Sequence, residues 1–357
     1  MLEYLDFNYG ENIKWWCIEG GAQQLAFNMQ NKLQIPNSIS FGSKITAIDT
    51  SVVDNAQIQI SGQWRGGYAG VFNSTTLGCM QQMDLSKVAL TYGQKQAIRS
   101  LGYGASAKIG MKFSRPWWIE KFGITNGGLG HSDLPIRTTV YPSYNLYDWS
   151  TDPSAPKPPP SAVLLCSYTW QQDAQRISAM ISSSTDHATA VQEEAPLREQ
   201  VLRDLALLHA NQPGSNMTPQ KVYELIEPLC EDHYAHDWYH DPNTLGAFAF
   251  FRPYQFGSMW PDIITPTPSF VMIGEHASNH HAWVVGALES AIHGVHGWLS
   301  QNTFPGAADA AKVMEGWGPP TDKNPFGGLP QFATHEQRRD LAAVGMFLER
   351  ELQADLK

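Results

Sequence analysis

The sequence predicts an α/β fold joined to a region in which helices flank a mixed sheet. One observation is the alternation of apolar and polar residues in short segments such as 106–113, which is typical of β-strands. Another is the leucine-rich stripe at helical spacing over 193–209. A third is residues 270–298, where a hydrophobic strand leads through a polar turn into a helix. With 357 residues, the chain is long enough for two or three domains.

The composition excludes several classes of protein. Hydrophobic residues make up 42% of the chain, and 12 Trp, 13 Tyr and 15 Phe need burial, so we exclude disorder over the whole length. No run of about 18 apolar residues free of charge, Gly and Pro is present, so we expect no transmembrane segment. The formal net charge of -10 makes the chain a poor general nucleic-acid binder, and we expect no nucleic-acid partner.

The four cysteines, Cys17, Cys79, Cys166 and Cys230, are widely spaced and form no CxxC pair. This spacing argues against a structural zinc site and against a dense disulfide framework, so we expect reduced, mostly buried thiols. The first residues lack a basic region and a long apolar region, so we expect no signal peptide in this chain. The sequence does not predict a compartment.

The N-terminal third predicts one helix and three strands. A pair of glycines precedes the helix, a proline follows it, and an Asp–Asn pair joins the first two strands. The third strand runs into four small polar residues. In chain order, we expect a helix over 25–33 and strands over 39–49, 55–62 and 71–72.

The middle of the chain predicts two longer strands, over 106–113 and 162–168. Between them, five prolines in 150–161 predict a stiff surface loop inserted into a domain. A helix over 193–209 follows, and another begins at Thr218, with Thr as its cap and Pro at its first position.

The C-terminal part contains the most informative segment. It predicts a buried strand over 270–274 and a helix over 282–299, and one face of that helix carries only small residues. The tail is rich in Gly and Pro to about residue 331 and then helical. The helix start offers unpaired N–H groups to an anion or to a ring edge, and Glu275 is placed to accept bonds from hydroxyls. The alternative is a strand–turn–helix unit without a ligand, since fold alone does not give function.

The residues of this segment resemble a known motif. The pattern G-E-x7-W-V-x-G-A-x-x-S-A, from Gly274 to Ala291, resembles the C-terminal flavin-binding motif of the flavin-dependent amine oxidases. Within that group, the chain is most similar to the L-amino-acid oxidases. Further segments agree in the family's order, and the resemblance covers roughly 15–298. These segments are 16–33, 44–48, 106–118, 133–145 and 246–256.

The resemblance implies a two-domain architecture. Residues 1–100 and 265–301 would form a partial, Rossmann-like FAD-binding domain whose G-x-G-x-x-G half is missing. Residues 101–264 would form the substrate-binding domain, with a mixed sheet. Residues 302–357 would be a C-terminal extension of unknown role.

For the cofactor, the resemblance implies contacts along the whole FAD. Ile45 matches the residue whose backbone meets the adenine, and Glu275 matches the glutamate that bonds the ribityl or ribose hydroxyls. Trp238 matches the tryptophan that packs against the isoalloxazine. No cysteine lies in 245–248, so the FAD should be non-covalent.

Three consecutive residues match the segment beside the flavin ring. Ala282 and Trp283 match a Gly–Trp pair, with Trp283 as one wall of an aromatic slot, and Val284 matches the backbone donor at the pyrimidine edge. Ala282 stands where the family more often has Gly, which narrows the slot.

For catalysis and substrate binding, the resemblance implies another set. Lys108 matches the lysine that holds a water at flavin N5, and Tyr168 matches the tyrosine that helps to bind the substrate carboxylate. Phe248 falls at an apolar contact near the reacting carbon. We therefore expect Lys108, Tyr168 and Trp283 to be catalytic, and Tyr168, Phe248, Ala282 and Trp283 to touch the substrate.

Each of these residues also has an ordinary interpretation. Lys108 would be a solvated charge at a strand edge, and Tyr168 and the tryptophans would be core residues. His276, His280 and His281 suggest a metal, but no carboxylate or Cys is spaced to complete a site, so we expect no metal. The joint pattern, and no single residue, favours the functional interpretation.

The resemblance implies FAD-dependent oxidative deamination of an L-amino acid to the keto acid, ammonia and hydrogen peroxide, by hydride transfer to flavin N5. Its partners would be the substrate and O2. The missing G-x-G-x-x-G, for which Gly102–Ala107 is the nearest segment, leaves three explanations open: a shortened sequence, one part of a split enzyme completed by an N-terminal half, or an inactive homologue. An oxidase of polyamines or monoamines is also compatible with the sequence, and so is a homo-oligomer.

Overall fold

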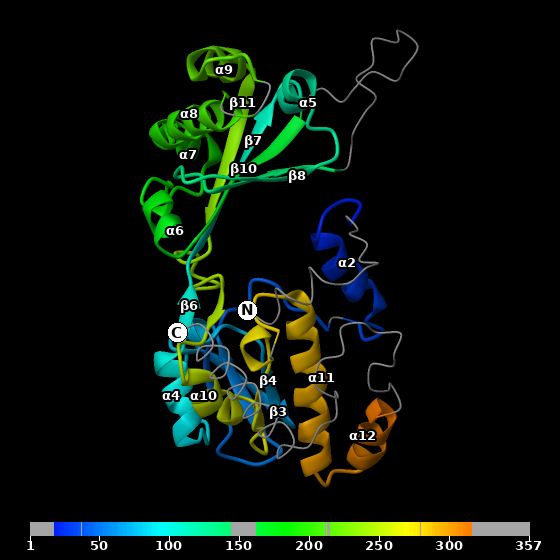
Figure 1. Ribbon diagram of the computed structural model, residues 1–357. Helices are drawn as coiled ribbons and strands as arrows, with labels where there is room; N and C mark the ends of the chain where they lie inside the picture. Colours follow the sequence, from blue (N-terminus) through cyan, green and yellow to red (C-terminus); the bar gives the residue numbers. More distant parts are fainter. Residues whose placement is uncertain are drawn as a thin grey trace, which may run out of the picture. The chain divides into compact units, whose positions relative to one another are not determined.

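The computed structural model describes residues 18–36, 38–143, 162–210, 212, 215–278 and 280–315. Its chain forms two compact units (Figure 1). One comprises the residues up to Tyr103 and from Pro242 onward, and the other comprises Gly104–Asp241. Cys17, the predicted loop over 150–161 and the predicted tail helix after residue 331 lie outside the described residues. Below, we describe each unit by itself.

The first unit contains a four-stranded sheet in the order β3-β2-β1-β5. Its strands are β1 (Ile45–Asp49), β2 (Ala56–Ile60), β3 (Gln63–Tyr68) and β5 (Asp84–Lys87). β1 pairs antiparallel with β2 and parallel with β5, so the sheet is mixed. Ser61 and Gly62, both at positive φ, make the two-residue turn between β2 and β3 that the right-handed twist of a hairpin favours.

A parallel pair of strands, β4 (Val71–Asn73) and β13 (Phe270–Met272), joins the two chain segments of this unit. Helix α11 (Val284–Gln301) packs on it with its small face. A Cβ on Gly294 would lie 2.4 Å from the Ile273 side chain, so only glycine permits this close approach. The backbone N–H of Gly274 also donates to Ser290 Oγ at 2.7 Å.

Most of the remaining elements of the first unit pack around a core that includes Leu77, Met80, Trp260 and Phe270. The helix Gln23–Lys32 buries no residue, and the helix Ala307–Glu315 belongs to a separate core around Trp298. Helix α4 starts with a capping box between Thr91 and Gln94. The helices and short strands are α2 (Gln23–Lys32), α3 (Leu77–Met80), α4 (Tyr92–Ser100), β6 (Gly102–Gly104), β12 (Phe248–Phe250), α10 (Gln255–Ile263), the 3-10 turn η2 (Glu275–Ala277) and α12 (Ala307–Glu315).

The second unit is built on a five-stranded sheet in the order β11-β7-β10-β9-β8. Neighbouring strands run antiparallel, so the mixed pairing that the sequence predicted here is found in the first unit instead. Consecutive strands lie beside one another only from β8 to β10, and β7 pairs with β10 and β11 across longer connections. The strands are β7 (Ser106–Phe113), β8 (Gly128–His131), β9 (Thr138–Tyr141), β10 (Ala162–Trp170) and β11 (Cys230–Asp237).

Helices cover one face of this sheet (Figure 1). Alternate residues of β7, among them Ile109 and Met111, are buried in the core with Leu202 and Leu205 of α8. The residues between them, Lys108, Gly110 and Lys112, belong to the opposite face. The helices of the unit are α5 (Trp117–Phe122), α6 (Gln171–Ser178), α7 (His187–Glu193), α8 (Ala195–Ala210), α9 (Pro219–Ile226) and the 3-10 turn η1 (Glu227–Leu229).

A search of the described residues for a helix both long and apolar enough to cross a membrane finds none.

Candidate functional site

The uncovered face of the second unit's sheet brings three of the predicted site residues together. The Lys108 ammonium nitrogen lies 4.6 Å from the centre of the Tyr168 ring and 5.2 Å from that of Trp238. Both contacts are within the range of cation–π attraction. Partial burial lowers the pKa of Lys108 from its ordinary value. This lysine is therefore a cation between two aromatic rings, and its surroundings differ from those of a fully solvated strand-edge charge.

Strand register explains why these residues meet. Lys108 of β7 lies opposite Tyr168 of β10 on one side and opposite His236 of β11 on the other. Just beyond β11, the backbone N–H of Trp238 donates to Ser106 O at 3.2 Å, which keeps Trp238 beside the start of β7. The His236 and Trp238 rings pack in a T-shaped arrangement, with 4.5 Å between their centres.

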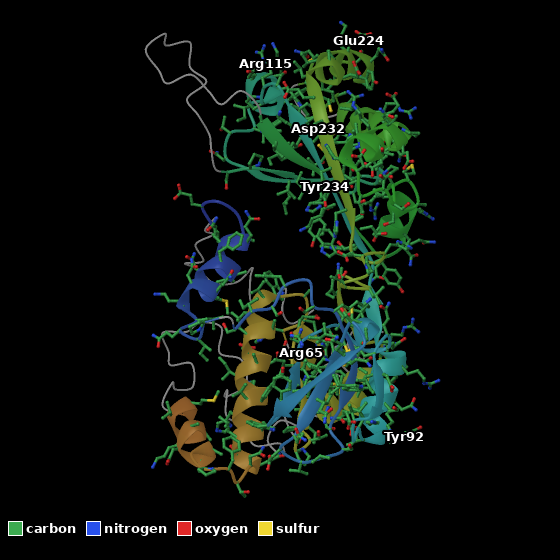
Figure 2. The ribbon with its side chains drawn as sticks, turned by 180° about the vertical axis from the view of Figure 1, so that it is seen from behind. Arg65, Tyr92, Arg115, Glu224, Asp232 and Tyr234 are labelled. Atoms are coloured by element: carbon green, nitrogen blue, oxygen red, sulfur yellow. The ribbon has the colours of Figure 1, made fainter. Side chains whose placement is uncertain are left out.

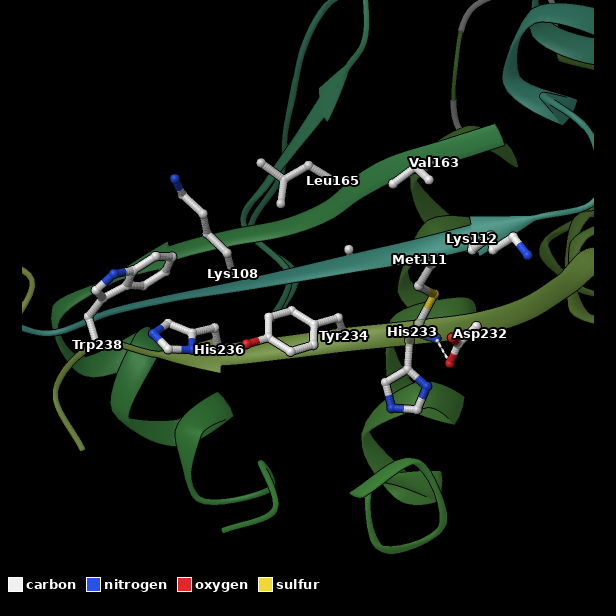
Figure 3. Close-up of a pocket in the computed structure, with 11 residues that line it drawn as sticks. Lys108, Met111, Lys112, Val163, Leu165, Asp232, His233, Tyr234, His236 and Trp238 are labelled. Carbon is white, nitrogen blue, oxygen red and sulfur yellow. Dashed lines mark hydrogen bonds between the residues drawn. The ribbon is translucent and has the colours of Figure 1, made fainter. Parts of the chain in front are cut away.

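This face also carries a pocket of about 620 Å³ (Figure 3). It extends from Lys108 and Trp238 along β7 to Lys112. Gly110, Tyr234 and His236 line it, and none of them was among the predicted site residues. Tyr234 and His236 of β11 and Trp238 just beyond it follow one another at a spacing of two, and this spacing was the signal in the sequence that they share a face. Figure 2 shows Tyr234 and Asp232 on β11 within the whole chain.

A second group of predicted residues lies in the first unit, around Glu275. Its carboxylate accepts a hydrogen bond from the backbone N–H of Ala282 at 2.7 Å. It also accepts from the N–H of Ala249, at 3.1 Å to each oxygen. Glu275 therefore ties β12 to the turn that precedes α11. A contact of Glu275 with ribityl or ribose hydroxyls stays a prediction.

The turn before α11 has a constrained backbone. Ala282 adopts a left-handed conformation with φ of 66°, which an L-residue rarely takes and which glycine takes without cost. Trp283 then occupies the N-cap position of α11, without a side-chain capping bond. A Cβ on Gly286 would lie 2.1 Å from His280 O and 2.4 Å from Ser278 Oγ, so the turn rests directly on the helix.

These residues fit the ring end of a flavin. Trp283, Val284, Val285 and Leu288 leave a large part of their apolar side chains exposed, at the first turns of an 18-residue helix. The carboxyl ends of β4 and β13 meet beside them, since a Cβ on Gly274 would lie 3.2 Å from Ser74 O; ligands bind at such ends of parallel strands. An apolar ring would cover this face, with Glu275 supporting the turn. No G-x-G-x-x-G phosphate loop occurs in the sequence.

Nearby, the buried His276 has one ring nitrogen without a hydrogen-bond partner among the described residues. Its side chain is 2% exposed, and its Nε2 has no hydrogen-bond partner there. Burial is the main reason why the pKa of His276 falls to about 3, so the ring is neutral near pH 7. No three His, Cys, Asp or Glu side chains of the described ranges are grouped so that they could hold a metal ion.

The two other predicted residues also belong to the first unit. Ile45 begins β1 and is partly buried against the core. Phe248 begins β12, one residue before the Ala249 N–H that bonds Glu275. Their proposed contacts with adenine and substrate stay predictions.

Comparisons with known proteins give a family and several relatives. Residues 2–295 match the family described as flavin containing amine oxidoreductase. The chain is 33% identical to L-amino-acid oxidase 4 of Hebeloma cylindrosporum over 320 residues, which cover 86% of this chain and 47% of that protein. It is 28% identical to an L-amino-acid oxidase of Siganus canaliculatus over 294 residues, 81% of this chain and 48% of that protein.

Among solved structures, the fold resembles that of cyclohexylamine oxidase from Brevibacterium oxydans IH-35A, with a TM-score of 0.53 and 13% sequence identity. That match covers 83% of this chain and 53% of the other. The chain thus spans about half the length of the proteins that it matches.

Proposed function

Because the chain belongs to the flavin-containing amine oxidoreductase family, whose cofactor is FAD, we propose that it acts in the oxidative deamination of L-amino acids. The overall reaction would convert the amino acid, O2 and water into the keto acid, ammonia and hydrogen peroxide. When bound, the flavin supplies the oxidising power for the carbon–nitrogen bond. Similarity to two L-amino-acid oxidases supports this choice of substrate.

The observation that carries the proposal is the position of Lys108 between Tyr168 and Trp238. A partly desolvated ammonium exerts a stronger field than a solvated one, because less water screens it. We infer that Lys108 would hold a water near flavin N5, on the side of the flavin where O2 reacts, and would stabilise negative charge that develops there. Tyr168, on the neighbouring strand, would donate its hydroxyl to the substrate carboxylate.

In the first unit, Trp283 and Val284 would hold the flavin ring, and Glu275 would keep their turn in place. Ala282 would set the width of the slot beside the ring, and Phe248 would contact the substrate near its reacting carbon. Ile45 would present its backbone to the adenine, and Trp238 would pack on the isoalloxazine. Together, these side chains would exclude water from the reacting carbon of the substrate and would orient that carbon. The absence of a cysteine in 245–248 supports a non-covalent flavin.

The experiment is a spectroscopic one. The purified chain would be supplied with FAD, freed of unbound cofactor and mixed anaerobically with L-amino acids. We expect the visible flavin absorption to be retained by the protein and then lost on mixing, with hydrogen peroxide appearing when air is admitted. Retained absorption that no L-amino acid bleaches, while a simple amine does, would favour oxidation of amines that lack a carboxylate.

A second candidate rests on the missing phosphate loop and on the half-length match to the relatives. In this case, the chain carries only one part of the site and binds FAD when an N-terminal part with G-x-G-x-x-G is present. A chain that stays colourless alone and becomes yellow when such a part is added would support it.

A further inference from the structure

The pocket face of the second unit has an ordered arrangement, and the roles above use only one end of it. β10, β7 and β11 place their residues in three rows across the sheet. The rows are Tyr168, Lys108 and His236; then Leu165, Gly110 and Tyr234; then Val163, Lys112 and Asp232. We call the space over the middle row, between Lys108 and Lys112, the sheet slot.

Gly110 is the floor of the sheet slot. A Cβ at this position would meet nothing closer than Leu164 O at 4.0 Å, so the space above the backbone is open. Lys108 and Lys112 are two residues to either side, which separates their Cα atoms by about 13 Å along the strand. Leu165 and Tyr234 stand on the flanking strands, about 9.5 Å apart. These dimensions suit one side chain with a ring.

The walls of the sheet slot are flat and mostly apolar. The Tyr234 ring is 64% exposed and lies almost parallel to the His236 ring, at an interplanar angle of 11° and 6.2 Å between centres. Leu165 and Val163 line the opposite wall (Figure 3). A planar apolar group would cover the exposed ring and Leu165 together, which removes apolar surface from water.

The far end of the sheet slot disfavours an anion. Lys112 pairs there with Glu231 at 3.1 Å, and the Asp232 carboxylate lies opposite Lys112 in the third row. The Asp232 carboxylate also contacts His187 at 3.0 Å. Two carboxylates against one ammonium would repel an acidic side chain.

We propose that the sheet slot binds the side chain of the substrate, that it takes a flat apolar side chain, and that Gly110 determines the size it admits. This inference rests on the proposed function, which puts the reacting carbon at the Lys108 end. The side chain then extends along β7 over Gly110 toward Lys112.

The test uses the full chain with FAD that has been reduced beforehand under anaerobic conditions, so that no amino acid is oxidised while titration calorimetry measures the binding of L-phenylalanine, L-alanine and L-glutamate. Gly110→Leu adds a side chain to the floor without a backbone clash. We expect it to weaken L-phenylalanine binding by about tenfold or more, and L-alanine binding by less than about threefold. Gly110→Ala should give a smaller loss. Glu224→Leu, on the exposed surface of α9 in the same unit, is the matched control and should change neither affinity (Figure 2).

Equal weakening of L-phenylalanine and L-alanine by Gly110→Leu would overturn the inference, as would no change in either. So would tighter binding of L-glutamate than of L-phenylalanine, or no binding of any of the three. Failure of the proposed function is visible separately. If L-phenylalanine binding depends on Gly110 but L-phenylalanine does not bleach the oxidised flavin, the slot inference holds and the proposed oxidase function fails. If both neutral amino acids are oxidised equally well by the Gly110→Leu variant, the oxidase function holds and the slot inference fails.

Discussion

At the scale of single residues, Lys108 and Lys112 show how neighbours on one strand face can differ. Both belong to the uncovered face of β7. Lys112 is exposed and forms an ion pair with Glu231, whereas Lys108 lies between two rings and its pKa is lowered by burial. An exposed ion pair contributes little to stability. Lys108 is therefore the lysine of this face to which we assign a chemical role.

Replacing Lys108 with methionine should slow one half of the reaction more than the other. In the active holoenzyme, we expect Lys108→Met to slow reoxidation by O2 by about tenfold or more and to change flavin reduction far less, because the cation acts on charge that develops with oxygen. Stopped-flow absorbance measures both steps. Lys221→Met, at an exposed position of α9, is the matched control, and equal slowing of both steps in Lys108→Met would contradict the role.

Asp204 gives a prediction about pH and stability. This carboxyl is 6% exposed, its Oδ2 has no hydrogen-bond partner among the described residues, and burial raises its pKa from 3.8 to about 6. Because the folded state holds this proton more tightly, the raised pKa favours folding fully below pH 3.8. That contribution to stability is lost as the pH rises through about 6.

Asp204→Asn, which stays neutral, should therefore stabilise the protein by about 1–3 kcal/mol at pH 7 and by nothing at pH 3.5. Urea unfolding at the two pH values measures this difference. An equal effect at both would show that the charge is not the cause.

The residues of the site were predictable to different degrees. Lys108, Tyr168 and Trp238 came from motif resemblance, and the structure places them side by side, although their roles stay predictions. The row of Leu165, Gly110 and Tyr234 depends on the register of strands more than 50 residues apart and on the irregularity between Leu165 and Ser167. A period of two shows which residues share a face of one strand, but not which residues of two strands lie opposite each other.

At the scale of elements, α11 and the turn before it act as one piece. The helix buries Gly286, Ser290 and Gly294, and the turn packs on its first residues. Small residues at this spacing let α11 approach β13 closely. The same contact fixes where Trp283 begins the helix.

Two glycines of α11 should respond in opposite directions to alanine. In Gly286→Ala, the new Cβ would clash with His280 O, so we expect a loss of about 2–4 kcal/mol in unfolding free energy and weaker FAD binding. In Gly297→Ala, the nearest atom is Pro266 Cγ at 3.6 Å, and the higher helix propensity should add up to about 1 kcal/mol. Thermal unfolding of both variants, with and without FAD, measures this. Similar effects of the two changes would contradict the packing argument.

Elements with strong local signals were predicted well. The strand over 106–113 is β7, and the helices over 193–209 and from Thr218 are α8 and α9. Helix α4 was missed, although Thr91 and Gln94 have the spacing of a capping box. The strand predicted over 55–62 corresponds to β2 and the turn after it. Ser61 and Gly62 reverse the chain there, and β3 follows. β3 was not predicted, because all six of its residues are exposed and no alternating apolar pattern marks them.

At the scale of the whole molecule, the two units differ in how the chain builds them. The second is one continuous segment, Gly104–Asp241, with its own core of Ile109, Leu202 and Leu205. The first is assembled from two segments, one before and one after the second unit in the sequence. The names FAD-binding and substrate-binding domain for the two stay predictions.

Residues 104–241 should therefore fold when expressed alone. We expect a cooperative urea transition and a mixed helix–sheet circular dichroism spectrum, because the described core of this unit is internal to it. The fragment should not retain FAD, since Glu275 and Trp283 belong to the first unit. A fragment without a cooperative transition would show that the unit depends on the rest of the chain.

The pairing of β4 with β13 has a consequence for biosynthesis. Val71 is about 200 residues from its partner Phe270, and the whole second unit is made between them. On the ribosome, the second unit can close as soon as it has emerged, while the segment before it waits with an open strand edge. Such an edge is a site for wrong pairing, so the yield of folded protein should depend on how quickly synthesis passes from residue 242 to the end of α11.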